Sequence, residues 1–398
     1  MTLTSGPILA AAVKGVKTPL PPLTARAPVD TTVASSNNKT RPGKVEREED
    51  AGALPPLLEV RDLHTEFRTG AGVVPAVAGI SYTVERGETV AIVGESGSGK
   101  TASALSLLRL IPDPPGRITE GQIIFAGRDL LRLSEEEIRQ VRGSDIGMIF
   151  QEPMTSLNPV LTIGRQITET LEQHRGADRA AAQRRAVELL GLVGIADPAR
   201  RLKQYPHQLS GGMRQRIMIA IALACDPKLI IADEPTTALD VTIQAQILEL
   251  MKDLTRRLDV ALIIITHNLG VVARYANRVN VMYAGRIIES GRAADIYHDP
   301  RHPYTMALLH SVPRLDRPRQ ARLDPVEGQP PDLTRLDAGC SFRPRCRFAV
   351  EACAKSRPAL EPAGDSGHFA ACFRSSEIVT ETVTAARAPQ LTSGLAVR

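Results

Sequence analysis

Hydrophobic and polar positions along the middle of the chain follow two alternating patterns. Short apolar runs typical of buried strands occupy residues 88–94, 146–150, 229–233 and 261–266. Other segments carry hydrophobic residues at every third or fourth position, which is the period of one helix face. The two clearest stripes comprise Met213, Ile217, Ala220, Ile221 and Ala224, and Ile243, Ile247, Leu250, Met251, Leu254 and Leu258. Strands that alternate with helices predict an α/β fold.

Two further segments flank this core. Residues 57–67 alternate in part like a strand and residues 77–84 offer a second strand, which together predict a small antiparallel β-subdomain. Residues 165–206 carry charged helical segments with one apolar face, and we expect an α-helical subdomain over about 152–225.

The ends of the chain differ in composition from its middle. Residues 1–56 are rich in Pro, Thr, Ala and Ser without a helical or strand period, so we predict a disordered tail there. The core domain then spans 57–295, and the prolines within 296–335 indicate an extension that ends in a linker. A small cysteine-rich element at 336–374 and a flexible tail at 375–398 complete the predicted organisation.

The composition favours a cytosolic protein over a membrane-spanning or secreted one. Hydrophobic residues make up 43% of the 398 positions, yet no apolar run approaches the roughly 20 residues that cross a bilayer, and no signal peptide is evident. A net charge of +5 is compatible with nucleic-acid binding, but aromatic residues are only 3% and tryptophan is absent. We therefore interpret the charge as a solvated basic surface.

Residues 94–101 match the pattern G-x-x-x-x-G-K-[ST], between a buried strand and a helix. Glycines let the backbone wrap around a polyphosphate, so that N–H groups and the positive end of the helix face the phosphates. We predict ATP binding here, with Lys100 neutralising β/γ charge and the Thr101 hydroxyl binding Mg²⁺; a chance glycine-rich turn is the alternative. The predicted nucleotide ligands are Gly94, Glu95, Ser96, Gly97, Ser98, Gly99, Lys100 and Thr101.

Four polar residues follow the ends of other apolar strands, where ligands gather in open parallel sheets. Gln151 offers an amide oxygen to Mg²⁺ or to the attacking water. Asp233 is predicted to bind Mg²⁺, and Glu234 to polarise the water that attacks the γ-phosphate. His267 ends the strand at 261–266. The alternatives are an ordinary polar loop, a solvated acidic turn and a structural histidine.

A second anion site is predicted at residues 209–216, Leu-Ser-Gly-Gly-Met-Arg-Gln-Arg. Ser210, Gly211 and Gly212 precede the helical stripe that begins at Met213, so a hydroxyl and unhindered N–H groups lie at a helix N-terminus.

These motifs together resemble the ATP-binding-cassette (ABC) ATPase family over residues 57–290, and residues 209–215 are the most specific part of the match. The resemblance implies a phosphate-loop, RecA-like core. It adds Asp240 to the catalytic residues and Gln215 to the nucleotide ligands, and it brings His267 to the γ-phosphate. It also implies a head-to-tail dimer in which Ser210, Gly211 and Gly212 close on the partner's nucleotide. The family's adenine-stacking aromatic is missing at the expected distance, and Phe67 is the nearest candidate.

Residues 152–159, 297–309 and 339–346 look like the corresponding segments of oligopeptide/dipeptide importer ATPases. That resemblance implies a peripheral position on the cytoplasmic face of the membrane. The implied partners are a second homologous ATPase, two transmembrane permeases and, indirectly, an extracytoplasmic solute-binding protein. The solute stays open among dipeptides, oligopeptides, nickel chelates and glutathione. A soluble ABC ATPase acting on DNA is the alternative, which the absence of a long heptad insertion in residues 101–210 disfavours.

Four of the five cysteines, Cys340, Cys346, Cys353 and Cys372, are separated by 5, 6 and 18 residues. Their spacing alone fits a zinc site and an iron–sulfur cluster equally. The importer resemblance implies a [4Fe–4S] cluster, while His368 leaves a Cys₃His Zn²⁺ site as the alternative. This segment has little apolar sequence to bury, so we expect metal to stabilise it. We also expect loss of one cysteine to leave ATP binding intact, because the two sites are distant in the chain.

Overall fold

The computed structural model describes residues 55–237, 239–311, 326–364 and 367–378. The predicted disorder of the N-terminal tail therefore lies almost wholly outside the described residues, as do most of the flexible tail and the prolines of the linker at 313, 318 and 325. Among the described helices, none has the length and apolar character needed to span a membrane.

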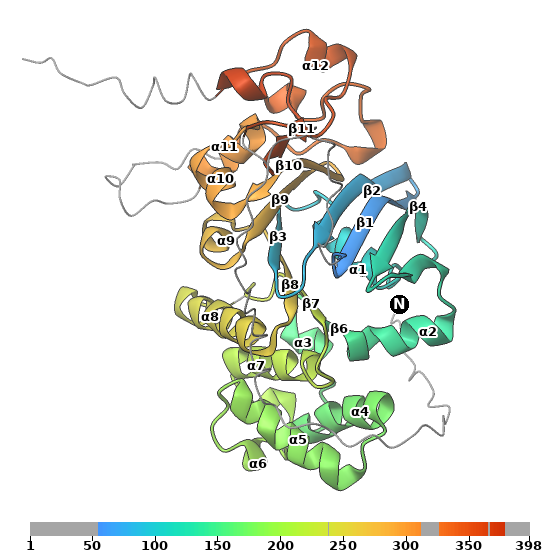
Figure 1. Cartoon of the computed structure of the whole chain (residues 1–398), viewed down its shortest axis with the longest axis vertical. Helices are drawn as coiled ribbons and strands as arrows, with labels where there is room; N and C mark the ends of the chain where they lie inside the picture. Colours follow the sequence, from blue (N-terminus) through green and yellow to red (C-terminus); the bar gives the residue numbers. More distant parts are fainter. Residues whose placement is uncertain (1–54, 238, 312–325, 365–366, 379–398) are drawn as a thin grey trace, which may run out of the picture.

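An eight-stranded mixed sheet forms the centre of the molecule (Figure 1), in the order β11-β12-β10-β9-β3-β8-β7-β6. The strands are β3 (Thr89–Val93), β6 (Ile146–Ile149), β7 (Leu229–Asp233), β8 (Ala261–Thr266), β9 (Arg278–Tyr283), β10 (Arg286–Arg292), β11 (Glu361–Pro362) and β12 (Phe369–Ala370). Strands β9, β3, β8, β7 and β6 are parallel. Every residue of β3, β7 and β8 is buried, because helices cover a parallel sheet on both faces. The apolar runs predicted from the sequence are therefore core strands.

A four-stranded antiparallel sheet, β2-β1-β4-β5, lies beside the central sheet and confirms the predicted β-subdomain. Its strands are β1 (Leu58–Thr69), β2 (Gly72–Val84), β4 (Gly116–Phe125) and β5 (Arg128–Asp129). Buried and exposed residues mix along β1, since one face of this sheet covers the core. The adjoining helices are α1 (Lys100–Leu107), η1 (Leu130–Arg132), α2 (Glu135–Gln140) and the π-type turn η2 (Val141–Asp145).

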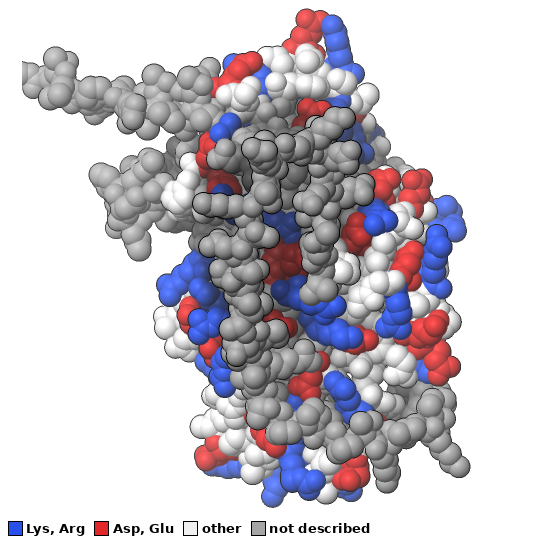
Figure 2. All heavy atoms as spheres, viewed as in Figure 1, with Lys and Arg blue, Asp and Glu red and all other residues white. Residues whose placement is uncertain are grey.

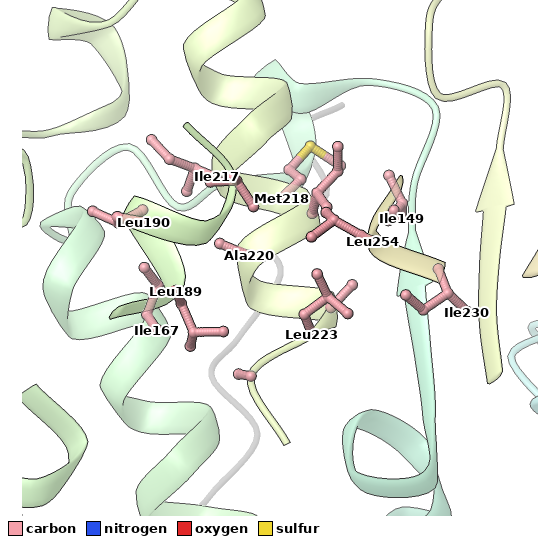
Figure 3. Close-up of a cluster of buried hydrophobic side chains, with 14 of the residues drawn as sticks. Ile149, Ile167, Leu189, Leu190, Ile217, Met218, Ala220, Leu223, Ile230 and Leu254 are labelled. Carbon is pink, nitrogen blue, oxygen red and sulfur yellow. The ribbon is translucent and has the colours of Figure 1, made fainter. Parts of the chain in front are cut away.

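Helices follow β6 and form the lower part of Figure 1. They are α3 (Pro153–Ser156), α4 (Ile163–Arg175), α5 (Arg179–Leu192), α6 (Pro198–Arg201), η3 (Pro206–Gln208) and α7 (Gly211–Ala222). Side-chain oxygens of Thr162, Asp178 and Ser210 cap α4, α5 and α7. Ile167, Leu189 and Ile217 meet in one buried cluster (Figure 3), so the predicted helical stripes are core packing. The chain continues through α8 (Val241–Leu258) and α9 (Leu269–Tyr275).

The C-terminal part packs on the edge of the central sheet. It comprises α10 (Ala293–His298), α11 (Pro303–His310), η4 (Leu333–Arg335), η5 (Arg343–Arg345) and α12 (Ala352–Lys355), together with β11 and β12. Strand β12 pairs with β10 and so extends the central sheet. The buried Phe342 ring lies 5.3 Å from the Tyr283 ring and 5.4 Å from the Tyr304 ring, measured between centroids. The expectation that this segment buries little apolar surface is therefore wrong, because Phe342 joins a core that it shares with the central sheet.

Candidate functional site

The carboxyl ends of β3, β8, β7 and β6 lie along one edge of the parallel sheet. The phosphate loop follows β3, and His267 follows β8. Asp233 ends β7, Glu234 comes next, and Gln151 lies two residues beyond β6. The parallel register thus brings residues from four separate sequence segments to a single edge, where open α/β sheets bind ligands.

Glycines allow the phosphate loop to turn between β3 and α1. The φ angles of Gly94, Gly97 and Gly99 are 157°, 79° and 101°, a region that residues with a Cβ rarely adopt. A Cβ on Gly99 would lie 2.1 Å from the carbonyl oxygen of Ala76, and one on Gly94 would lie 2.3 Å from that of Met282. Both positions therefore require glycine for close approach as well as for backbone conformation.

Lys100 places a buried cation across this loop. Its Nζ donates to the carbonyl oxygens of Gly94 and Glu95, at 2.8 Å and 2.9 Å. Burial lowers the pKa of Lys100, while nearby carboxylates, Glu234 first, act to raise it. A polyphosphate placed at the loop would supply the further negative charge that favours the ammonium form.

Asp233 and Thr101 form an oxygen-rich pair at the start of α1. The Thr101 Oγ1 donates to Asp233 Oδ1 at 3.2 Å, and Asp233 is only 3% exposed. Burial raises the pKa of Asp233, and the Thr101 hydrogen bond opposes that shift. A hydroxyl and a carboxylate are the donor types that Mg²⁺ prefers, and a cation would restore the ionised carboxylate.

Glu234 is the meeting point of the polar side chains at this edge. Its Oε2 accepts from Gln151 Nε2 at 3.2 Å and from the Thr237 hydroxyl at 2.9 Å, and it lies 3.4 Å from His267 Nδ1. The Glu234 side chain is 15% exposed, whereas that of His267 is 59% exposed. Glu234 is thus a held carboxylate with limited access to water, which suits a general base. Sequence reasoning missed Thr237, whose only signal is a hydroxyl three residues after the acid.

The second predicted anion site lies at the start of α7. Ser210 is exposed and its Oγ accepts from the Met213 N–H at 3.4 Å. A Cβ on Gly212 would lie 2.9 Å from Ile243 Cγ2, so this glycine lets α7 approach α8. Gln215 is 1% exposed. Among the described residues, no hydrogen bond or ion pair connects these residues to the phosphate loop of the same chain.

Asp240 and Phe67 have structural partners of their own. Asp240 caps α8, since its Oδ1 accepts from the Ile243 N–H at 3.0 Å. Phe67 lies on β1 opposite Gly116 of β4, where a Cβ on that glycine would lie 2.7 Å from the Phe67 ring. Their catalytic and adenine-binding roles stay predictions.

The four clustered cysteines lie near one another as free thiols in the C-terminal segment. The Cys340 N–H donates to the Cys353 carbonyl at 2.9 Å. Burial raises the pKa of the Cys340, Cys346 and Cys372 thiols, and the neighbouring thiols add to each shift. Within the described part of the chain, no three of their sulfurs lie within 4.8 Å of one another.

Two family models match this chain, one over the region that carries the site edge and one over the C-terminal part. Residues 77–237 match the ABC transporter model, which covers the site edge from the phosphate loop to Thr237. Residues 288–353 match the model of the oligopeptide/dipeptide transporter, C-terminal region. The oligopeptide transport ATP-binding protein OppD of Bacillus subtilis is 54% identical over 310 residues, which is 78% of this chain and 87% of that protein. The chain belongs to the peptide ABC transporter ATPases.

Other matches agree with this assignment. The dipeptide transport ATP-binding protein DppD of Bacillus subtilis is 53% identical over 317 residues, 80% of this ABC ATPase and 94% of that protein. A dimeric post-hydrolysis structure of the ATP-binding cassette MJ0796, bound to ADP and Pi, superposes with a TM-score of 0.54 at 28% identity. It covers 59% of this chain and 98% of its own. The cassette fold and the ATPase class expected from the sequence are confirmed.

Two residues of the ABC ATPase that touch the phosphate loop escaped sequence reasoning. The Glu95 N–H donates to the Tyr304 hydroxyl at 2.8 Å, and Arg345 forms an ion pair with the Glu95 carboxylate. The expectation that the cysteine-rich segment lies apart from the ATP site is therefore wrong. Distance along the sequence misled it, because 250 residues separate Glu95 from Arg345.

Proposed function

We propose that this subunit hydrolyses ATP to energise the import of peptides across the cytoplasmic membrane. The observation that carries the proposal is the presence, in one chain, of an ABC cassette and of the oligopeptide/dipeptide C-terminal region. It acts peripherally on the cytoplasmic face, with two transmembrane permeases, a second ABC ATPase subunit and, indirectly, an extracytoplasmic solute-binding protein. Relatives named for peptide transport favour this function over a DNA-acting ATPase. Figure 2 agrees with that choice, since basic and acidic side chains intermingle where described residues are visible.

The proposed reaction is in-line attack of water on the γ-phosphate. Glu234 accepts the water's proton, and its bonds from Gln151 and Thr237 hold the carboxylate in place. His267, whose Nδ1 lies 3.4 Å from Glu234, would stabilise the charge that develops on the γ-phosphate. Lys100 neutralises phosphate charge from within the loop.

Thr101 and Asp233 are the residues that would hold Mg²⁺, with Gln151 nearby as an amide ligand. The oxygen donors of Thr101 and Asp233 already lie 3.2 Å apart. When bound, Mg²⁺ would neutralise phosphate charge as a Lewis acid.

The proposed active form is a head-to-tail dimer in which Ser210 completes the partner's ATP site. Its support is that Ser210 and Gly211 are exposed at the N-terminus of α7, a helix of twelve residues. Ser210→Arg should leave ATP bound to this subunit's own loop but lower hydrolysis at the partner's site by about 10²-fold, a typical loss for a donor to transition-state charge. Single-turnover hydrolysis and nucleotide binding, measured in the complex and in isolated subunits, separate the two effects.

Ser134→Arg is the matched control, because Ser134 also caps a helix, α2, yet lies in a capping box away from the ATP edge. It should affect stability and leave hydrolysis near normal. If Ser210→Arg weakens ATP binding in the isolated subunit, the serine acts within its own chain and the composite-site model fails.

The cysteine segment is proposed to hold a [4Fe–4S] cluster. Four thiolates around zinc stand roughly 3.8 Å apart, given zinc–sulfur bonds of about 2.3 Å, whereas no three of the described sulfurs here lie within 4.8 Å of one another. A four-iron cluster separates its thiolates further, since each binds a different iron. Among the described residues, no three ligand atoms drawn from His368 and these cysteines lie within 4.8 Å of one another. These observations favour the cluster over either zinc site.

Co-purification tests the proposed function. Tagged subunit, recovered from native membranes in mild detergent, should bring two permeases and a second ABC ATPase. The associated binding protein is then screened against dipeptides, oligopeptides, a nickel chelate and glutathione. Peptide binding supports the proposal, whereas exclusive binding of nickel chelate or glutathione would redirect it to those solutes. Recovery of DNA without permeases would overturn it.

A further inference from the structure

Glu95, the second residue of the phosphate loop, is tied to the C-terminal segment on two sides. Its backbone N–H donates to the Tyr304 hydroxyl of α11 at 2.8 Å. Its carboxylate accepts from Arg345 Nη1 at 2.7 Å and from Arg345 Nη2 at 3.0 Å. A bidentate pair of this kind fixes the carboxylate in direction as well as in distance.

The Arg345 guanidinium is held on all of its other edges. Its Nε donates to the Glu327 carbonyl at 2.8 Å, and Nη2 donates to the Val326 carbonyl at 3.1 Å. The guanidinium carbon lies 5.9 Å from the centroids of the Tyr283 and Phe342 rings. Its side chain is 4% exposed. Because the donors are satisfied and the side chain is buried, Arg345 presents a rigid fork to Glu95.

The position of Glu95 also bears on Lys100, since the Lys100 Nζ donates to the Glu95 carbonyl at 2.9 Å. A loop residue held at its N–H, its carbonyl and its carboxylate has little freedom to move. We propose that Arg345 is a positioning residue for ATP: through Glu95 it holds the phosphate loop in the shape that binds nucleotide. The C-terminal segment is thereby a structural part of the ATP site.

This coupling extends to the cysteines. Arg345 ends η5 and directly precedes Cys346, and the Cys346 N–H donates to the Arg343 carbonyl at 3.1 Å. We therefore expect disorder at Cys346 to disturb the backbone that positions Arg345. This link between the cysteines and ATP binding rests on the proposed cluster. Loss of the cluster should weaken ATP binding even though no residue of the phosphate loop is changed.

A double-mutant cycle in the full-length chain, purified without oxygen, tests the positioning role. Arg345→Met and Glu95→Gln should each raise the Kd of a fluorescent ATP analogue by roughly 5- to 150-fold, the usual range for coupled sites. The Kd of the double variant should equal that of the single variants, because both substitutions remove the same contact between Arg345 and Glu95. In the assembled complex, KM for ATP should rise while kcat at saturating ATP stays within about threefold of wild type. Arg345→Lys should restore part of the affinity.

Arg343→Met is the matched control, since Arg343 lies in the same turn but pairs with the exposed Asp337. It should leave the Kd unchanged. The proposal would be overturned if the effects of Arg345→Met and Glu95→Gln on Kd were additive, or if Glu95→Gln left the Kd unchanged. Glu95→Gln keeps the test valid even if loss of Arg345 unfolds the C-terminal segment. Iron analysis separates the cluster proposal from the proposed role of Arg345. If the wild-type protein contains no metal but the two substitutions are still non-additive, the cluster is rejected and the role of Arg345 is retained.

Discussion

Glu234→Gln should lower ATP turnover in the assembled transporter by about 10²- to 10⁴-fold, the usual worth of a general base. The amide keeps the size of the side chain and its hydrogen bond with Thr237, but it cannot take a proton from the attacking water. ATP should stay bound with near-normal affinity, because the proposed phosphate contacts come from Lys100 and the loop glycines and not from Glu234. Steady-state hydrolysis and nucleotide binding measure the two quantities separately.

Glu249→Gln serves as the control, since Glu249 is 57% exposed on α8 and pairs with Arg274 away from the site edge. It should hydrolyse ATP at the wild-type rate. Near-normal hydrolysis by Glu234→Gln would remove Glu234 from the mechanism, and Thr237 and Gln151 would then be orienting a carboxylate without a catalytic task.

If the proposed [4Fe–4S] cluster is present, the wild-type subunit should be brown with about four irons per chain, and Cys353→Ser should abolish that iron. Metal ligation supplies on the order of 10 kcal/mol of folding free energy in small metal-dependent elements, so residues 336–364 should exchange amide hydrogens much faster. ATP affinity should also fall, because Arg345 loses its support. Iron, sulfide and zinc analysis with hydrogen exchange measure these changes.

Cys225→Ser is the matched cysteine control. Cys225 is fully buried beyond α7 and its thiol faces the Thr170 carbonyl at 3.7 Å, within the helical subdomain. Iron should be retained in this variant. Stoichiometric zinc without sulfide in the wild type would favour the zinc alternative, and an absence of metal after anaerobic purification would reject both.

The catalytic edge was predictable because its signals are local. Each polar residue follows a continuous apolar run, and parallel strands must place such residues together, so Asp233, Glu234 and His267 could be assigned to one edge before their distances were known. Thr237 lacked such a signal. A hydroxyl three residues beyond an acid is common in sequences. The Thr237 hydroxyl reaches the Glu234 carboxylate only because the chain turns at Glu234, where φ is 45°.

The docking of the C-terminal segment could not be predicted. Strands β11 and β12 span two residues each, too few to show a period of two. Arg345 is one of 49 basic residues, and nothing in its neighbourhood of the sequence points to Glu95. Pairing over such separations is set by the sheet edge and by the shared core around Phe342, which exist only in the folded chain.

Peptide uptake by the reconstituted transporter tests the central claim most directly. The subunit, its partner ATPase and the two permeases are placed in vesicles with the solute-binding protein on the outside and ATP inside, and a labelled peptide is added. We predict uptake that requires ATP and falls with the hydrolysis rate when Glu234→Gln replaces the wild-type subunit. Uptake that continues at the wild-type rate with Glu234→Gln, or ATP hydrolysis that never moves peptide, would contradict the account.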